Sequence, residues 1–391
     1  MAHEGRPIMP FSVLRDELTA LDESALRRRR RTLDSAQSAH VTVDGKKFLA
    51  FCSNDYLGLA NHPELITAAK AGADTYGVGA GASHLVLGHA RAHEDAEQQL
   101  AAFVNLPRAL LFSTGYMANL GTVTALVGRE DAVFADRLNH ASLNDACLLS
   151  RAQFKRYAHN DLTQLEKLLA ATQARRKLIV ADAVFSMDGD FAPVPELLAL
   201  AERHDAWLLL DDAHGFGVLG ANGRGVLEHF GITHPRIVYM ATLGKAAGVS
   251  GAFVAGDATL IETLMQRART YIYTTAMPPL LACAVSKSLQ LIAAGAPLRQ
   301  QLAKNIIQLK QILKNELPKG WRLLPSITAI QPLVIGDNHA ALAVAEKLAA
   351  RGVLVPAIRP PTVAPGTARL RISLSAAHTA DDVRTLCEAL H

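Results

Sequence analysis

The sequence predicts an α/β protein, with a large domain built on a mostly parallel sheet that helices cover on both faces, and a smaller C-terminal α+β domain. Two observations predict this fold class. From about residue 109, short apolar segments of strand length alternate with segments of helical periodicity. After about residue 279 the alternation gives way to long helices and a few separate strands. With 391 residues, half of them hydrophobic, the chain can bury a sizeable core.

The elements follow from local patterns along the chain. An amphipathic helix precedes Arg27, so we assign residues 1–45 to an N-terminal helical segment. We assign residues 46–290 to the large domain and residues 291–391 to the small domain. Strands are expected at ALLFST, DAVFAD, KLIVADAVF, WLLLDDA, RIVYMATL, AFVAGD and, in the small domain, AIQPLVIGD, VLVPAIRP and ARLRISLS. Helices are expected at HASLNDACLLS, DLTQLEKLLAATQ and VPELLALAERH, and near residues 338–351; Asp161 and Gln164 form a capping pair in the second.

Composition and charge argue against several classes of protein. The net charge is only +4, and the single dense basic run, Arg27–Arg31, follows a helical pattern, which favours a solvated helix end over a nucleic-acid-binding arm. The four cysteines are too widely spaced for a metal or redox pair, which fits a reducing cytoplasm. The N-terminus has no signal-peptide pattern, and the uncharged run at 109–128 contains polar residues and glycines that indicate a buried strand and helix. We therefore expect no nucleic-acid partner and no membrane.

The stretch ATLGKAAG places Lys245 among small and apolar neighbours, directly after the strand RIVYMATL. A buried lysine without a partner tends to give up its proton, and the neutral amine is a nucleophile. A phosphate-binding loop would need glycine in place of Tyr239 and Ser or Thr in place of Ala246. The remaining alternatives are a loop lysine that reaches water and a lysine kept for carbonyl chemistry.

Two more polar clusters follow strand ends, where sites form in open parallel sheets. Gly115 opens a helix whose backbone N–H groups suit a phosphate, although the adjacent Ser and Thr also suit simple caps. Asp211, Asp212 and His214 follow WLLL, where a carboxylate needs a cation or a protonated ring nitrogen; capping of the next turn by Asp211 is the simpler alternative. Together the three clusters fit pyridoxal phosphate, which carries a phosphate, a basic ring nitrogen and an aldehyde.

The motifs SNDYLGL, DDAHGFGVLGANGRG, LGKAAGVSGA and AIRPPTVAPGTARLRIS resemble the α-oxoamine synthases, and the match runs from about Arg27 to the C-terminus. The resemblance implies an aspartate-aminotransferase-like fold (pyridoxal-phosphate fold type I) and a homodimer with shared sites. It is strongest to the branch that condenses L-alanine with a pimeloyl thioester of coenzyme A or acyl carrier protein, with loss of carbon dioxide. A sister enzyme using glycine and a short acyl-CoA, an aminotransferase, and a non-catalytic nucleotide- or nucleic-acid-binding protein remain alternatives.

The resemblance also implies roles for individual residues. Lys245 would hold the cofactor as a Schiff base and act as the base, Asp211 would pair with the pyridine nitrogen, His214 would bond the phenolic oxygen, and His140 would stack on the ring. Further cofactor contacts would come from Gly115, Tyr116, Ser186, Thr242 and, across the dimer, Thr274 or Thr275.

The substrate residues are assigned in the same way. On ARLRISLS, Arg369 and Arg371 share one face, so that at least one of them can point inward. We assign Arg371 to the alanine carboxylate, with a surface ion pair as the alternative, and Arg27, Asn54, Thr362 and His140 to further substrate contacts. The loop GVGAGASHLVLG departs from the glycine- and serine-rich loop of the family at Ala80, Ala82 and His84.

Overall fold

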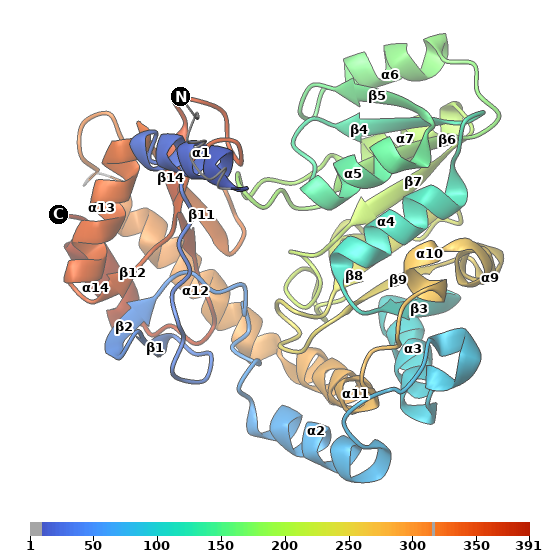
Figure 1. The fold of residues 1–391 in the computed structure, drawn as a ribbon, viewed down its shortest axis with the longest axis horizontal. Coiled ribbons are helices and arrows are strands. Elements are labelled where there is room, and N and C mark those ends of the chain that lie inside the picture. Colours follow the sequence, from blue (N-terminus) through green and yellow to red (C-terminus); the bar gives the residue numbers. More distant parts are fainter. Residues whose placement is uncertain (1–9, 315–316) are drawn as a thin grey trace, which may run out of the picture.

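The computed structural model describes residues 10–314 and 317–391. Figure 1 shows two lobes: a large one built from the middle of the chain, and a smaller one in which N-terminal residues lie beside C-terminal ones. Helices α11 (Pro279–Ala294) and α12 (Ala296–Leu313) lead from one lobe to the other and meet at a bend of 67°. In the described part of the chain no single helix is long and apolar enough to cross a membrane, and only this bent pair passes that test jointly.

The large lobe is built on a seven-stranded sheet in the order β3-β9-β8-β7-β6-β4-β5. Strand β9 is antiparallel to both of its neighbours, and every other pair is parallel. The predicted, mostly parallel sheet is therefore confirmed. The strands are β3 (Arg108–Phe112), β4 (Ala132–Asp136), β5 (Gln153–Tyr157), β6 (Lys177–Asp182), β7 (Ala206–Asp211), β8 (Ile237–Thr242) and β9 (Ala252–Gly256).

Helices cover both faces of this sheet, as Figure 1 shows. Alternate side chains of one strand enter two different apolar clusters: Leu208 and Leu210 of β7 join one cluster, and Leu209 joins the other. Burial on both faces explains why the strand sequences are almost continuously apolar. The first cluster includes residues of α3 (Arg91–Val104), α6 (Leu162–Ala171), α7 (Val194–Arg203), α8 (Val226–Phe230) and α11; the second includes residues of α4 (Gly115–Leu126), α5 (Ala141–Ser150), α9 (Ala258–Arg267) and α10 (Arg269–Ile272).

The predicted helices of the large lobe are α5, α6 and α7. The side chain of Asp161 caps α6, because its Oδ1 accepts a hydrogen bond from the backbone N–H of Gln164 at 2.8 Å. Two further elements, α2 (Pro63–Tyr76) and the single π-helical turn η1 (His84–Gly88), precede α3. The predicted capping pair is thus confirmed at its first residue.

The small lobe contains two short sheets. A four-stranded sheet has the order β10-β11-β14-β13, and a three-stranded sheet has the order β1-β2-β12. In the second sheet β2 lies parallel to β12, so residues 46–50 sit beside residues 353–354. The elements are α1 (Ser12–Glu23), β1 (His40–Val43), β2 (Lys46–Ala50), β10 (Arg322–Leu323), β11 (Ile330–Gly336), α13 (Asn338–Ala350), β12 (Val353–Leu354), β13 (Ala357–Ile358), β14 (Ala368–Ser373) and α14 (Ala380–Leu390).

The smaller C-terminal α+β domain is present, whereas the numerical boundaries at 45/46 and 290/291 stay predictions. Helix α1 lies in the predicted N-terminal helical segment, of which residues 1–9 fall outside the described residues. The pairing of β2 with β12 brings the first residues of the predicted large domain into the small lobe.

Candidate active site

A cavity of about 200 Å³ lies beyond the carboxyl ends of β6, β7 and β8, where the sequence places its polar clusters. Asp182 and Asp211 end adjacent parallel strands in register, and α4 and α5 begin at the rim. The site therefore forms at the strand edge that the topology predicts. The following residues predicted to bind the cofactor line the cavity: Gly115, Tyr116, His140, Ser186, Asp211, His214, Thr242 and Lys245.

Lys245 lies in a tight turn after β8. Its carbonyl oxygen accepts the N–H of Gly248 at 2.8 Å. Gly248 has a φ of 69°, and a Cβ there would lie 2.6 Å from the carbonyl carbon of Leu59, so the turn requires glycine. Nζ lies 3.5 Å from Thr242 Oγ1, and burial lowers the pKa of Lys245; Asp211 and Asp182 oppose that change, and Arg371 adds to it. Burial therefore favours the neutral, nucleophilic form of the amine.

The two aspartates that follow β7 have different surroundings. Asp211 lines the cavity; its Oδ2 accepts a hydrogen bond from Asn119 Nδ2 at 2.7 Å and its Oδ1 one from the N–H of Ala213 at 3.0 Å. Asp212 is fully buried and accepts hydrogen bonds from Tyr239 Oη at 2.8 Å and from the N–H of Val226 at 2.7 Å. Burial raises the pKa of Asp212 to about 7. Asp211 is the carboxylate available to a ligand, and Asp212 holds the turn that follows.

Two histidines, His140 and His214, line the cavity. His140 precedes α5; its N–H donates to Asp182 Oδ2 at 3.0 Å, and its Nδ1 lies 2.7 Å from Ser142 Oγ. His214 Nδ1 lies 2.7 Å from the hydroxyl of Tyr56. Burial lowers the pKa of His140 and lowers that of His214 well below 6.5. Both rings are therefore neutral hydrogen-bonding groups near pH 7.

The N-terminus of α4 also borders the cavity, through Gly115 and Tyr116. Thr114 caps the helix by accepting the N–H of Met117 at 3.1 Å. A Cβ on Gly115 would lie 2.6 Å from Thr242 Cγ2, so glycine lets this helix approach the end of β8. Tyr116 stands at the rim with its hydroxyl bonded to Asp145. The free N–H groups of the first turn suit an anion.

Arg371 reaches the same region from β14. Its Nε donates to the carbonyl oxygen of Ser186 at 2.6 Å, and its Nη1 donates to Asn54 Oδ1 at 3.1 Å. Its Nη2 lies 3.4 Å from Tyr56 Oη, which also contacts His214. Arg371 is 6% exposed, and no acidic side chain of the described residues forms an ion pair with it. Its charge therefore remains available to a ligand.

The neighbouring Arg369 is equally buried but forms an ion pair with Asp188. Both arginines therefore point inward, as the alternation along β14 predicts, and only Arg371 is left without a carboxylate among the residues described. Asn54, predicted as a substrate residue, joins Arg371 to Tyr56.

Six of the predicted residues do not line this cavity. Arg371 and Asn54 lie next to it, because Arg371 bonds both to Asn54 and to the lining residue Ser186. The other four lie elsewhere. Arg27 lines a larger cavity of about 800 Å³ and forms an ion pair with Asp22 at 2.6 Å. Thr362 lines a shallower depression beside that cavity, next to Arg359. Thr274 is half-buried and Thr275 is exposed, between α10 and α11. The role predicted for these two threonines concerns a second subunit and stays a prediction.

Sequence reasoning missed four polar residues that line the cavity or contact the predicted residues: Asn119, Ser142, Asp182 and Tyr56. Asp182 ends a strand as Asp211 does, so the strand-end rule was sufficient to find it. Asn119 lies four residues after Gly115, on the helix face that meets Asp211. Tyr56 lies within the motif SNDYLGL, but its contacts with His214 and Arg371 join segments far apart in the sequence. No local pattern predicts such contacts.

The residues of the cavity fit pyridoxal phosphate. Two buried oxygens there, Asn119 Oδ1 and Asp182 Oδ1, have no hydrogen-bond partner within the described ranges, which marks a polar space made for a ligand. An amine for an aldehyde, a carboxylate for a ring nitrogen and a helix N-terminus for a phosphate surround the same space. This site and this fold define a pyridoxal-phosphate-dependent enzyme of fold type I.

Comparison with known proteins identifies the family. Residues 46–390 match the family described as aminotransferase class I and II, and the chain belongs to that family. The 8-amino-7-oxononanoate synthase of Nitrosospira multiformis is 65% identical over 378 residues, which cover 96% of this chain and 94% of that protein. The chain is a pyridoxal-phosphate-dependent C-acyltransferase of the α-oxoamine synthase type, and its cofactor is pyridoxal 5′-phosphate.

Two solved structures illustrate the same fold. A serine palmitoyltransferase from S. paucimobilis, with a bound PLP–myriocin aldimine, superposes with a TM-score of 0.91 at 31% identity and covers 99% of this chain and 98% of its own. The 8-amino-7-oxononanoate synthase of Francisella tularensis superposes with a TM-score of 0.77 at 32% identity, covering 88% of this chain and 96% of its own.

Proposed function

We propose that the protein condenses L-alanine with a pimeloyl thioester, releasing carbon dioxide and the free thiol and forming 8-amino-7-oxononanoate for biotin synthesis. One observation carries the proposal: the guanidinium of Arg371 is buried near Lys245 and has no acidic partner among the residues described. A guanidinium in that state suits the carboxylate of an amino acid substrate. The identity to 8-amino-7-oxononanoate synthases supports this choice within the family.

The cofactor, when bound, supplies an electron sink for a carbanion next to the amino nitrogen. Lys245 would hold its carbonyl carbon, and Asp211 would keep its ring nitrogen protonated. His140 would cover one face of the ring, and His214 would donate to the phenolic oxygen. The hydrogen bonds from Asn119 and Ala213 fix the Asp211 carboxylate for this role.

The phosphate would lie at the first turn of α4, held by the N–H groups of Gly115 and Tyr116. Thr242 and Ser186 also line the cavity and would make further contacts. In a homodimer, Thr274 or Thr275 of one subunit would reach the phosphate of the other. Support for a dimer comes from exposed apolar side chains beside these threonines: Val86, Leu87 and Tyr273 are more than two-thirds exposed.

Alanine would bind with its carboxylate on Arg371. The hydrogen bonds of Arg371 to Ser186 and Asn54 fix the guanidinium plane, so the α-carbon is held at one position relative to Lys245. Burial lowers the pKa of Lys245, which favours the free amine that would take the α-proton.

The pimeloyl chain would enter from the larger cavity. Arg27, Arg29, Arg31 and Arg359 line it, together with apolar side chains of β1 and the end of β12. This combination suits an apolar chain with an anionic end, such as a pimeloyl carboxylate or the phosphates of its carrier. Arg27 and the nearby Thr362 would then be acyl-donor contacts.

One assay tests the reaction. The purified, cofactor-loaded protein receives L-alanine with pimeloyl-CoA or pimeloyl acyl carrier protein, and carbon dioxide and free thiol are both measured. We expect equal amounts of the two products. Greater thiol release from glycine and acetyl-CoA would instead identify a sister α-oxoamine synthase such as glycine C-acetyltransferase, and pyruvate from alanine alone would identify an aminotransferase.

A second test concerns Lys245 directly. Borohydride reduction of the cofactor-loaded protein, followed by peptide mapping, should leave the cofactor on Lys245. Lys177, whose Nζ donates to a backbone carbonyl away from the cavity, is the internal control. Label on Lys177 or on any lysine other than Lys245 would contradict the assignment.

A further inference from the structure

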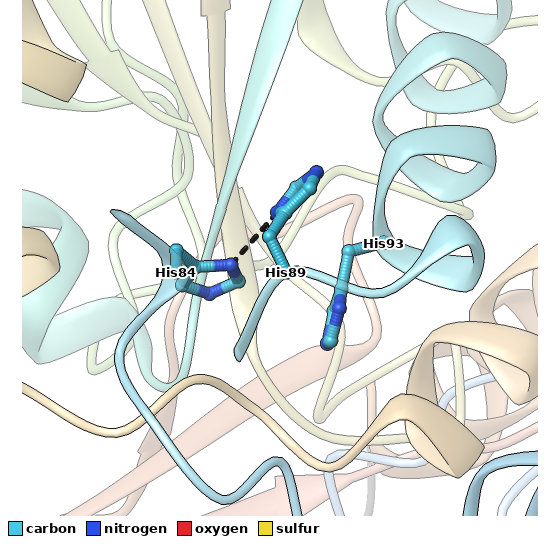
Figure 2. A group of neighbouring side chains, drawn as sticks. All are labelled: His84, His89 and His93. Atoms are coloured by element: carbon cyan, nitrogen blue, oxygen red, sulfur yellow. Dashed lines mark hydrogen bonds between the residues drawn. The ribbon is translucent and has the colours of Figure 1, made fainter. Parts of the chain in front are cut away.

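Three histidines gather away from the active-site cavity, at the start of α3. His84 lies in η1, His89 lies between η1 and α3, and His93 lies in the first turn of α3. His84 and His93 are buried, and the side chain of His89 is one-quarter exposed. One ring nitrogen from each lies within 4.8 Å of the others, and Figure 2 shows the three rings side by side. None of them lines the cavity around Lys245.

Each ring is held by its surroundings. His84 stacks on Tyr271 of α10 with ring centroids 4.7 Å apart and planes 9° from parallel. His93 Nε2 lies 2.7 Å from the carbonyl oxygen of Met277, so this nitrogen carries the proton and Nδ1 keeps its lone pair. His89 Nε2 lies 3.4 Å from a carboxylate oxygen of Glu94, which likewise leaves the lone pair on Nδ1.

These contacts reproduce the usual surroundings of metal-binding histidines. Such residues bind the ion through one nitrogen and donate the other N–H to a carboxylate or carbonyl oxygen. Glu94 plays that part for His89, and Met277 plays it for His93. The Nδ1 atoms of His84 and His89 lie 2.9 Å apart, close to the separation of about 3.3 Å that two imidazoles adopt on one tetrahedral zinc ion.

We propose that His84, His89 and His93 form a binding site for a divalent transition-metal ion, with Zn²⁺ as the best-fitting ion. Three imidazoles favour zinc and its neighbours in the first transition row over Mg²⁺ and Ca²⁺, which prefer oxygen ligands. The side chain of His89 is one-quarter exposed in the single chain, and a water would complete the tetrahedral set as the fourth ligand.

Two local changes accompany binding. Without the ion, His84 Nδ1 carries a proton and donates it to His89 Nδ1. In the metal-bound form this proton lies on His84 Nε2, so that His84 Nδ1 can bind the ion. His93 Nδ1 exchanges the N–H of Ala90, now 3.0 Å away, for the ion. Ala90 precedes α3, so its N–H lies outside the helical ladder and can turn to water.

A second set of ligands shares His89. His89, Glu94 and Glu97 also bring one ligand atom each within 4.8 Å of one another. Glu97 Oε1 already accepts the N–H of Leu111 at 2.8 Å, so this carboxyl is bonded to the backbone of β3 and is less available to an ion. The set of three imidazoles is therefore the one we propose.

The experiment uses the full chain without an affinity tag, loaded with its cofactor and freed of excess pyridoxal phosphate. Zn²⁺ alone is the probe. Isothermal titration should give one Zn²⁺ per chain, and zinc should raise the melting temperature. His89→Gln and His84→Gln should each weaken binding more than 100-fold, and Glu94→Gln should weaken it by about 10-fold. His40→Gln is the matched control, because His40 also contacts a carboxylate, Asp382, but lies in β1.

Folding is checked by the melting temperature and cofactor absorbance of each variant without zinc. X-ray absorption spectroscopy at the zinc edge should show histidine nitrogen ligands at about 2.0 Å from the ion. Binding of no stoichiometric zinc by the parent protein overturns the proposal. Equal zinc affinities of His84→Gln and the parent also overturn the proposal. If Glu97→Gln loses zinc binding while His84→Gln keeps it, the ion lies on the set of His89, Glu94 and Glu97, and the proposal is likewise overturned.

Discussion

The cavity around Lys245 and the cavity beside Arg27 are built in different ways. The small one, of about 200 Å³ around Lys245, is lined by residues at the carboxyl ends of parallel strands and at the starts of two helices. The large one, of about 800 Å³, lies between the N-terminal arginine run and residues 339–359 of the small lobe. The first is fixed by the topology of one sheet, whereas the second depends on segments that meet only after the small lobe has assembled.

The two cavities also differ in how firmly their charged side chains are held. The small cavity holds charges whose neighbours are fixed by hydrogen bonds, as Asp211 is by Asn119 and Ala213. The large cavity holds side chains that are partly exposed: Arg27 is about one-third exposed and bonds to Asp22. We therefore expect substitutions in the small cavity to change rates strongly, and substitutions in the large cavity to change affinities modestly.

The largest effect is expected for Asp211→Asn. The amide cannot keep the cofactor ring nitrogen protonated, so kcat should fall by a factor of about 100 or more while the cofactor still binds. Asp212→Asn is the control, because Asp212 contacts Tyr239 and Val226 and should affect the melting temperature more than kcat. Rates from product assays and cofactor absorbance decide between the two, and a mild Asp211→Asn beside a damaging Asp212→Asn would show that the wrong carboxylate was chosen.

The next effect is expected for Arg371→Ala, which should weaken alanine binding by roughly 10- to 100-fold, since a hydrogen-bonded charge pair is lost. The measurement is an alanine titration followed by the cofactor spectrum. Arg369→Ala is the matched variant from the same strand face, and because Arg369 pairs with Asp188 it should lower the melting temperature and leave alanine affinity closer to that of the parent. Similar alanine affinities for the parent and Arg371→Ala would remove the carboxylate role.

A smaller effect is expected for Arg27→Ala in the large cavity. The KM for the acyl donor should rise by roughly 3- to 10-fold, as for a partly exposed charge contact, and alanine binding should stay nearly unchanged. Arg30→Ala is the control from the same run, since Arg30 does not line the cavity. Acyl-donor kinetics that are the same for all three proteins would identify the arginine run as a solvated helix end.

The smallest effect on catalysis, and instead an effect on stability, is expected at His159, which lies at the same edge of the sheet but outside the small cavity. Burial opposes its protonation, but contacts with Asp136 and Asp190 raise the pKa of His159 to about 10. The folded state thus holds a proton that the unfolded state loses near pH 6.5, so this stabilisation is complete below pH 6.5 and is lost as the pH rises to about 10. Relative to His159→Gln, the parent should be more stable by roughly 2 kcal/mol at pH 6. Denaturant unfolding at several pH values should show this difference shrinking toward pH 10; a difference that does not change with pH would contradict the assignment.

The contrast between the cavities also explains what the sequence could predict. Lys245, Asp211 and Gly115 follow strands whose patterns are clear, and the rule for parallel sheets brings them together. The roles of Arg371 and Asn54 came from the family resemblance, and their contact joins residues 317 positions apart. The large cavity was not predicted as a cavity, because its wall depends on how β1, β12 and the arginine run pack. Helical periodicity also gave no sign of the π-helical turn at His84–Gly88.

The pairing of β2 with β12 has a consequence for synthesis on the ribosome. Residues 46–50 are made about 300 residues before Val353 and Leu354, the partners of Leu49 and Ala50. At about 5–20 residues per second, the β1–β2 hairpin waits roughly 15–60 s with one edge open while the seven-stranded sheet is completed. An open strand edge is a template for pairing with another chain. The β1–β2 hairpin is therefore a place at which the nascent chain can aggregate, and a holdase that covers residues 40–50 would protect it until β12 emerges.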